Sequence, residues 1–195
     1  MNGRGNITRF SGKPAKLPIP PAYNITFEKQ IFPRPKRYLL RLINTSFDTT
    51  FVFSIDNHNL TVIGADFVPI HSYSNTSVLI GIGQRYHVVV EANPIANGSQ
   101  PIPHDLNFWM RTYVAGCTNT TNFTKGYELS GILRYDSSST AMPTSRPWNG
   151  MSLACSDETY SSLRPVLKWQ VGGPSNTIPE KNTTSSSIQL LYHIL

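Results

Sequence analysis

The chain has 195 residues and a formal net charge of +6, with 39% hydrophobic, 11% aromatic and only 14% charged residues. This apolar content can build a core, which excludes a wholly disordered chain. Lysine and arginine are scattered rather than gathered in a stripe, and no apolar run approaches the ~20 residues that span a bilayer. We therefore expect neither nucleic-acid binding nor insertion into a membrane.

The predicted elements are short strands joined by turns. Residues 1–22 are rich in glycine and proline and are expected to form a lead-in linker, followed by a β domain over residues 23–136. Alternation in 85–91 predicts Tyr86, Val88 and Val90 inward, with His87 outward. The succession of short strands separated by turn residues predicts an all-β antiparallel sandwich or barrel. The expected strands are 37–44, 51–55, 58–64, 77–82, 85–91, 107–113 and 128–135.

The pattern breaks after the β domain. Residues 137–147 are polar and rich in serine, threonine and proline, which is typical of a connector. We expect residues 137–195 to wrap back on the sandwich as an irregular C-terminal extension and to end in the truncated start of a following domain.

Nine N-x-[ST] sequons occur in the chain, whereas a cytosolic chain rich in serine, threonine and asparagine would hold some by chance. Each is a candidate N-glycosylation site, and together they predict a secreted glycoprotein. A signal peptide is absent from this chain, because the residues after Met1 are polar, so we expect a missing leader or a fragment. The sequons are at Asn6, Asn24, Asn44, Asn59, Asn75, Asn97, Asn119, Asn122 and Asn182.

The two cysteines agree with an oxidising compartment. Cys117 and Cys155 form an even pair, so one disulfide is expected, with two free buried thiols as the alternative. A disulfide here would stabilise the fold by roughly 3–4 kcal/mol in the chain-entropy model.

No motif for metal binding or nucleophilic catalysis is present. The five histidines form no H-x-H pair, and no histidine follows Cys117 or Cys155 within a few residues. A blue copper site needs such a cysteine with two histidines, so we expect no metal in this chain. No G-x-S-x-G elbow, P-loop or dinucleotide fingerprint occurs either.

Asp66 is the most interesting carboxylate, because it follows a buried-looking strand and precedes an apolar segment. An acid in this setting can face a pocket, although a turn-capping aspartate is the simpler alternative. Asp56, Glu91 and Asp105 are more simply solvated or turn residues. His58 and His87 are expected to be polar-face or cross-strand residues, and Trp109 is expected in the core rather than on a binding surface. Arg34, Lys36 and Arg37 are expected to be solvated.

Several segments in order carry a family resemblance. Residues 37–45, 53–66 and 83–90 resemble the middle domain of fungal laccase-type multicopper oxidases. The opening NGRG at residues 2–5, the segment NFWMR at 107–111 and the segment GILRY at 131–135 are similar to the same domain. The resemblance covers roughly residues 1–170 in order, so it is far more specific than any single motif.

The resemblance implies three Greek-key, cupredoxin-like domains, with copper in the first and third and none in the second. The parent enzyme would oxidise phenols and aromatic amines and reduce O2 to water. This chain would have flanking copper-binding domains as partners and would be inactive alone. Asp66 would hydrogen-bond a phenolic substrate at a shared pocket, and Ala115 and Gly116 would lie at its rim. A Cys117–Cys155 disulfide also matches some members.

Two alternatives remain open. The first is a free-standing, secreted, glycosylated β-sandwich that binds a glycan or a protein without catalysis. The second is another branch of the family, such as a ferroxidase or an ascorbate oxidase. The sequences on either side of this chain would discriminate between the first alternative and the laccase interpretation.

Overall fold

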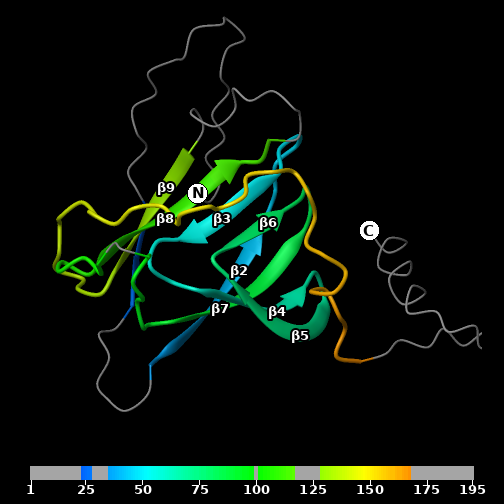
Figure 1. Cartoon of the computed structure of the whole chain (residues 1–195), viewed down its shortest axis with the longest axis horizontal. Helices are drawn as coiled ribbons and strands as arrows, with labels where there is room; N and C mark the ends of the chain where they lie inside the picture. Colours follow the sequence, from blue (N-terminus) through cyan, green and yellow to red (C-terminus); the bar gives the residue numbers. More distant parts are fainter. Residues whose placement is uncertain (1–22, 28–34, 99–100, 117–127, 168–195) are drawn as a thin grey trace, which may run out of the picture.

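The computed structural model describes residues 23–27, 35–98, 101–116 and 128–167, and these form two packed β-sheets (Figure 1). One sheet has the strand order β1-β9-β8-β3-β6 and the other has the order β2-β7-β4-β5. The strands are β1 (Tyr23–Thr26), β2 (Arg37–Ile43), β3 (Phe51–Ile55), β4 (Leu60–Ala65), β5 (Val68–Asn75), β6 (Ser77–Ile80), β7 (Arg85–Glu91), β8 (Asn107–Val114) and β9 (Glu128–Arg134).

All strand pairs are antiparallel except that of β1 with β9, which is parallel. Sequence neighbours often lie in different sheets: β3 pairs with β6 and β8, whereas β4 pairs with β5 and β7. The all-β class predicted from the strand pattern is confirmed.

The core lies between the sheets and follows the period-two alternation of the strands. Strand β7 alternates between buried Tyr86, Val88 and Val90 and more exposed neighbours, as predicted. The largest fully buried side chains include Phe27 and Phe108. Burial of this apolar surface provides the main driving force for the fold.

Two strands were not expected from the sequence. Strand β5 carries Pro69, His71 and two serines, so its composition is too polar and interrupted to predict a strand. Strand β1 has only four residues and pairs with β9, more than a hundred residues later in the chain. The predicted strand 58–64 also begins two residues later, at Leu60.

The segment 137–167, which we call the strap, runs from the outer face of the first sheet to the edge of the second, in yellow to orange in Figure 1. Near its start, Ser145 accepts a hydrogen bond from the Trp109 backbone of β8 at 3.0 Å. Near its end, Pro165 forms a β-bridge with Ile70 of edge strand β5. The strap therefore joins both sheets, while the domain boundaries given above stay predictions.

Candidate functional site

Asp66 lies in the turn between β4 and β5, with a backbone φ of 51°. Aspartate adopts this left-handed conformation more readily than most residues. Its N–H donates to the carbonyl of Arg85 at 2.6 Å, and its Oδ1 accepts a hydrogen bond from the Arg85 N–H at 3.0 Å. Asp66 therefore does cap a turn, and these bonds fix its carboxylate against the first residue of β7.

The second carboxylate oxygen of Asp66 is not committed to the fold. Within the part of the chain that the structure describes, Oδ2 has no hydrogen-bond partner, and the residue is partly exposed. One oxygen that holds the turn and one that is available can coexist in a single carboxylate, because each oxygen accepts hydrogen bonds separately. The turn-capping and ligand-facing interpretations are therefore compatible.

Arg85 and Phe67 flank this carboxylate. The guanidinium carbon of Arg85 lies 4.0 Å from the centroid of the Phe67 ring, which is the geometry of a cation–π contact. Phe67 is nonetheless 85% exposed, so the ring is available to a further partner. An acid, a cation and an aromatic face thus lie together at one turn.

Asn44 ties two neighbouring loops to this end of the sandwich. Its side-chain Nδ2 donates to the carbonyls of Thr49 at 2.8 Å and Ile80 at 2.9 Å. Its backbone carbonyl accepts a hydrogen bond from Gly83, whose φ of 76° suits glycine. The loops at 44–50, 66–67 and 81–84 therefore meet at one end, which we call the Asp66 end.

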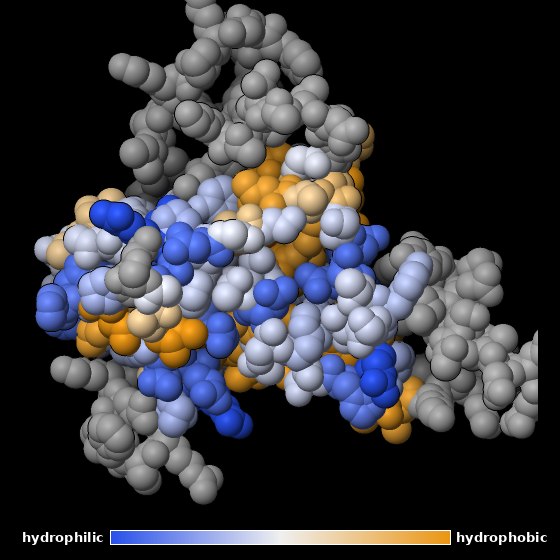
Figure 2. All heavy atoms as spheres, viewed as in Figure 1, coloured by the Kyte–Doolittle hydropathy of each residue, from blue (hydrophilic) through white to orange (hydrophobic). Residues whose placement is uncertain are grey.

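The Asp66 end is unusually apolar for a solvent-facing surface. Phe47 is 99% exposed and Phe67 is 85% exposed, and Ile43 and Ile82 at the same end are also exposed. Figure 2 shows the surface in one view, where hydrophobic areas form separate patches between polar ones. Several large apolar side chains exposed on neighbouring loops indicate a surface that is covered by a partner or a ligand.

Ala115 and Gly116 follow β8 and reach the same end. The Ala115 N–H donates to the carbonyl of Thr50 at 2.9 Å, and the Ala115 side chain is buried against Val52 and Leu79. Gly116 is partly exposed. The fold brings both residues to the Asp66 end, but no hydrogen bond in the described residues joins them to Asp66, and their place at a pocket rim stays a prediction.

The predicted disulfide partner Cys117 lies outside the described residues. The residues beside it are placed, however: Gly116 donates to the Leu153 carbonyl at 2.8 Å and accepts a hydrogen bond from the Cys155 N–H at 3.3 Å. These bonds bring the chain next to Cys117 alongside Cys155. The backbone arrangement supports the disulfide, which stays a prediction.

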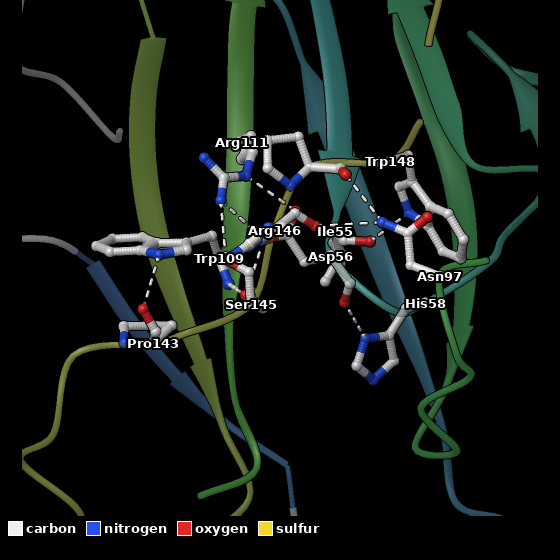
Figure 3. Close-up of polar contacts among 11 residues, drawn as sticks. Ile55, Asp56, His58, Asn97, Trp109, Arg111, Pro143, Ser145, Arg146 and Trp148 are labelled. Carbon is white, nitrogen blue, oxygen red and sulfur yellow. Dashed lines mark hydrogen bonds and ion pairs between the residues drawn. The ribbon is translucent and has the colours of Figure 1, made fainter. Parts of the chain in front are cut away.

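A buried polar network lies on the first sheet, under the strap (Figure 3). Arg111 donates two hydrogen bonds to the Asp56 carboxylate, from Nε to Oδ1 and from Nη2 to Oδ2, both at 2.9 Å. Ser145 of the strap donates to the same Oδ2 at 2.8 Å. The indole N–H of Trp148 donates to the Ile55 carbonyl at 2.9 Å. This network attaches the strap to the sandwich.

The structure corrects two expectations here. Asp56 lies in the turn after β3, which was one of its two expected placements, but it is completely buried in an ion pair and so is not solvated. His58 is also fully buried rather than on a polar face, with Nδ1 2.8 Å from the Asp56 carbonyl and Nε2 2.8 Å from the Tyr135 hydroxyl. Burial lowers the pKa of His58 to about 4, although the bond to Asp56 opposes that shift. A carbonyl can only accept, so Nδ1 carries the proton and Tyr135 donates to Nε2.

The remaining predicted polar residues do not join the Asp66 end. Glu91 pairs with Arg37 at 2.8 Å on the exposed side of β2 and β7. The expectation that Trp109 lies in the core is wrong: it is half-buried on the outer face of the first sheet, where its indole donates to the Pro143 carbonyl of the strap at 3.1 Å. In the described ranges no three His, Cys, Asp or Glu side chains lie together as metal ligands, and no helix there could span a membrane.

These features define the class of protein as a cupredoxin-like β-sandwich with a wrapped C-terminal strap. Comparison with known proteins makes this assignment more specific. A family model described as "Multicopper oxidase" matches residues 2–138. The chain therefore belongs to the multicopper oxidase family.

Individual relatives agree with this family. The chain is 48% identical over 139 residues to Laccase-2 of Botryotinia fuckeliana, covering 71% of this chain and 22% of that protein. It is 37% identical to dihydrogeodin oxidase of Aspergillus terreus, covering 91% of this chain and 27% of that protein. The crystal structure of the laccase from Botrytis aclada is 42% identical with a TM-score of 0.61, over 78% of this chain and 25% of that one. The chain thus spans roughly a quarter of the relatives that it matches.

Proposed function

We propose that this chain is the second, copper-free domain of a laccase-type oxidase and that the Asp66 end forms one wall of its phenol site. The observation that carries this proposal is Asp66 itself. One oxygen of its carboxylate is held by β7, the other is uncommitted, and the next residue in the chain, Phe67, is 85% exposed. The laccase relatives at 42% and 48% identity favour the laccase branch over a ferroxidase or an ascorbate oxidase.

In this proposal the flanking domains of the same polypeptide hold the copper, which supplies one-electron oxidation when bound. The residues of this chain bind and orient the substrate. Oδ2 of Asp66 accepts a hydrogen bond from the phenolic O–H. As the phenol loses an electron its hydroxyl becomes strongly acidic, and Asp66 takes the proton. Four such oxidations reduce one O2 to two waters.

The exposed apolar side chains of the Asp66 end support an interdomain contact. A free-standing domain would expose Phe47 and Phe67 to water without any gain in stability. A neighbouring domain that covers them would bury both rings and place its own groups close to Asp66. We therefore assign the covering partner to a flanking domain of the same polypeptide, in the secreted enzyme.

The first prediction concerns Asp66→Asn in the full-length oxidase. We expect kcat/KM for a phenol to fall by about a hundredfold or more, because the amide can bind the hydroxyl but cannot take its proton. Ferrocyanide loses an electron without losing a proton, so its oxidation should be unchanged. Steady-state kinetics with both substrates checks this. An equal loss with both would show that the substitution damaged electron transfer or folding, and would contradict the assigned role.

The second prediction concerns the double substitution Phe47→Ser and Phe67→Ser. In the chain alone, the free energy of unfolding should change by no more than ~0.5 kcal/mol for each substitution, because both rings are largely exposed. In the full-length oxidase, the same changes should lower the melting temperature, since they remove the apolar contact between domains. Calorimetry on both proteins tests this difference, and equal effects in the two would contradict the interface.

The transcript that contains this chain provides the most direct test of the domain assignment. H-x-H pairs upstream and a His-Cys-His segment downstream would support it. A message that encodes no copper ligands on either side would reject the oxidase and favour a secreted sandwich that binds a glycan or a protein through the Asp66 end.

A further inference from the structure

The side chains of four of the nine sequons are described, and they divide into two classes by burial. Asn44 is only 5% exposed and Asn97 only 2%, whereas Asn59 and Asn75 are exposed. The side chains at Asn6, Asn24, Asn119, Asn122 and Asn182 lie outside the described residues. The sequence motif is identical in both classes, so only the fold can distinguish them.

Both amide hydrogens of the Asn44 side chain are already used in hydrogen bonds within the fold. An N-glycan replaces one of the two amide hydrogens on Nδ2, and both of these are used in bonds to Thr49 and Ile80. Its Oδ1 also accepts hydrogen bonds from the backbone N–H and the hydroxyl of Ser46, at 2.9 and 2.6 Å. A glycan here would break a buried hydrogen bond and separate the loops that form the Asp66 end.

Asn97 has the same kind of constraint in a different place. Its Nδ2 donates to the Pro147 carbonyl at 2.8 Å and lies 3.4 Å from the Arg146 carbonyl, both in the strap (Figure 3). A sugar on this nitrogen would occupy the space between the sandwich and the strap. Asn97 therefore acts as an internal bond between two parts of the fold.

Asn59 and Asn75 have the opposite environment. Within the described residues, no hydrogen bond uses the side-chain nitrogen of either asparagine. The side chain of Asn75 only accepts one hydrogen bond there, from the Thr76 N–H to its Oδ1 at 2.8 Å. Leu60 pairs with Asn75 across the β4–β5 ladder, so the two asparagines are neighbours in register. Asn59 precedes β4 and Asp66 follows it, which places both sites at the opposite end of the hairpin from Asp66.

We propose that Asn59 and Asn75 carry a pair of adjacent N-glycans at the end opposite Asp66, and that the amides of Asn44 and Asn97 stay unmodified. The inference rests on the secretory location included in the proposed function. It accounts for a sequon within the apolar Asp66 end, since Asn44 is buried there and leaves that surface free of sugar. The sugar faces solvent, and the glycan-free end faces the neighbouring domain.

The experiment is peptide mapping of the full-length protein secreted from a yeast host. Enzymatic removal of glycans in H2¹⁸O converts each formerly glycosylated asparagine to ¹⁸O-labelled aspartate. We expect the label at residues 59 and 75 and none at residues 44 and 97. A label at either buried site, or an unlabelled residue at 59 or 75 in the secreted protein, would overturn the proposal.

Two single variants provide an independent readout without disturbing the fold. Asn59→Gln and Asn75→Gln should each remove the mass of one glycan, and the double variant should remove two, while secretion continues. Phenol oxidation by the same preparations is measured separately. If both glycans are present but the protein does not oxidise phenols, the proposed function is rejected and this inference stands. If Asn44 is labelled in an active oxidase, this inference is rejected and the proposed function stands.

Discussion

Asp56→Asn is expected to lower the free energy of unfolding by about 3–5 kcal/mol, the largest effect of any substitution considered for this fold. The variant keeps the shape of the side chain but removes its charge. Arg111 would then lose the carboxylate that accepts both its Nε and Nη2 bonds, because a neutral amide takes its place. Ser145 would also lose a carboxylate acceptor, which would loosen the strap.

Urea unfolding followed by tryptophan fluorescence measures this effect, and Trp148 reports on the strap directly. The matched control is Glu91→Gln, which breaks the ion pair with Arg37 on the exposed surface. That change should cost no more than about 1 kcal/mol, because water solvates both groups. The double variant Asp56→Asn with Arg111→Met should recover part of the loss. A cost of Asp56→Asn no larger than that of Glu91→Gln would contradict the assigned role of the pair.

The two ion pairs also show what the sequence could and could not predict. The inward faces of β2, β3 and β7 follow from local alternation, so they could be derived from residues a few positions apart. The Asp56–Arg111 pair joins residues 55 positions apart, and Ser145 reaches Asp56 over 89 positions. No local pattern carries that information, so the sequence predicted a solvated or turn position for Asp56 but not its burial in an ion pair.

The candidate site was partly accessible to sequence reasoning for a related physical reason. An acid between two apolar segments has few structural explanations, which drew attention to Asp66. Its partner Arg85 starts a strand that is paired only through the tertiary fold, and the exposed rings of Phe47 and Phe67 look like core residues in the sequence. Only the tertiary fold, which brings the three loops to one end, shows that both rings are exposed.

The second large effect is a loss of stability in mild acid caused by His58. In the unfolded chain this imidazole has an ordinary pKa of 6.5, whereas burial lowers the pKa to about 4 in the folded protein. Above pH 6.5 both states are neutral and His58 contributes nothing to the pH dependence. Below it the unfolded state binds a proton that the folded state excludes, so the free energy of unfolding falls, by about 2 kcal/mol at pH 5 and about 3 kcal/mol near pH 4.

The environment of His58 explains why the folded state resists that proton. Nε2 accepts from the Tyr135 hydroxyl, whose own pKa is raised by burial, so that hydroxyl stays protonated and donates. A proton on Nε2 of His58 would face the hydroxyl hydrogen that Tyr135 already donates to this nitrogen. It would also place a positive charge beside the Phe108 ring, whose centroid lies 4.8 Å from that of the imidazole in an edge-to-face contact. The Asp56 carboxylate does not compensate, because Arg111 already pairs with it.

His58→Gln tests this account, because glutamine can donate and accept but does not titrate in this range. The variant starts from a lower stability at pH 7, so the quantity to compare is the slope between pH 7 and pH 4.5. Wild type should lose about 2–3 kcal/mol more than the variant over that interval. Parallel slopes for wild type and His58→Gln would show that the acid sensitivity does not come from His58 and would contradict this account.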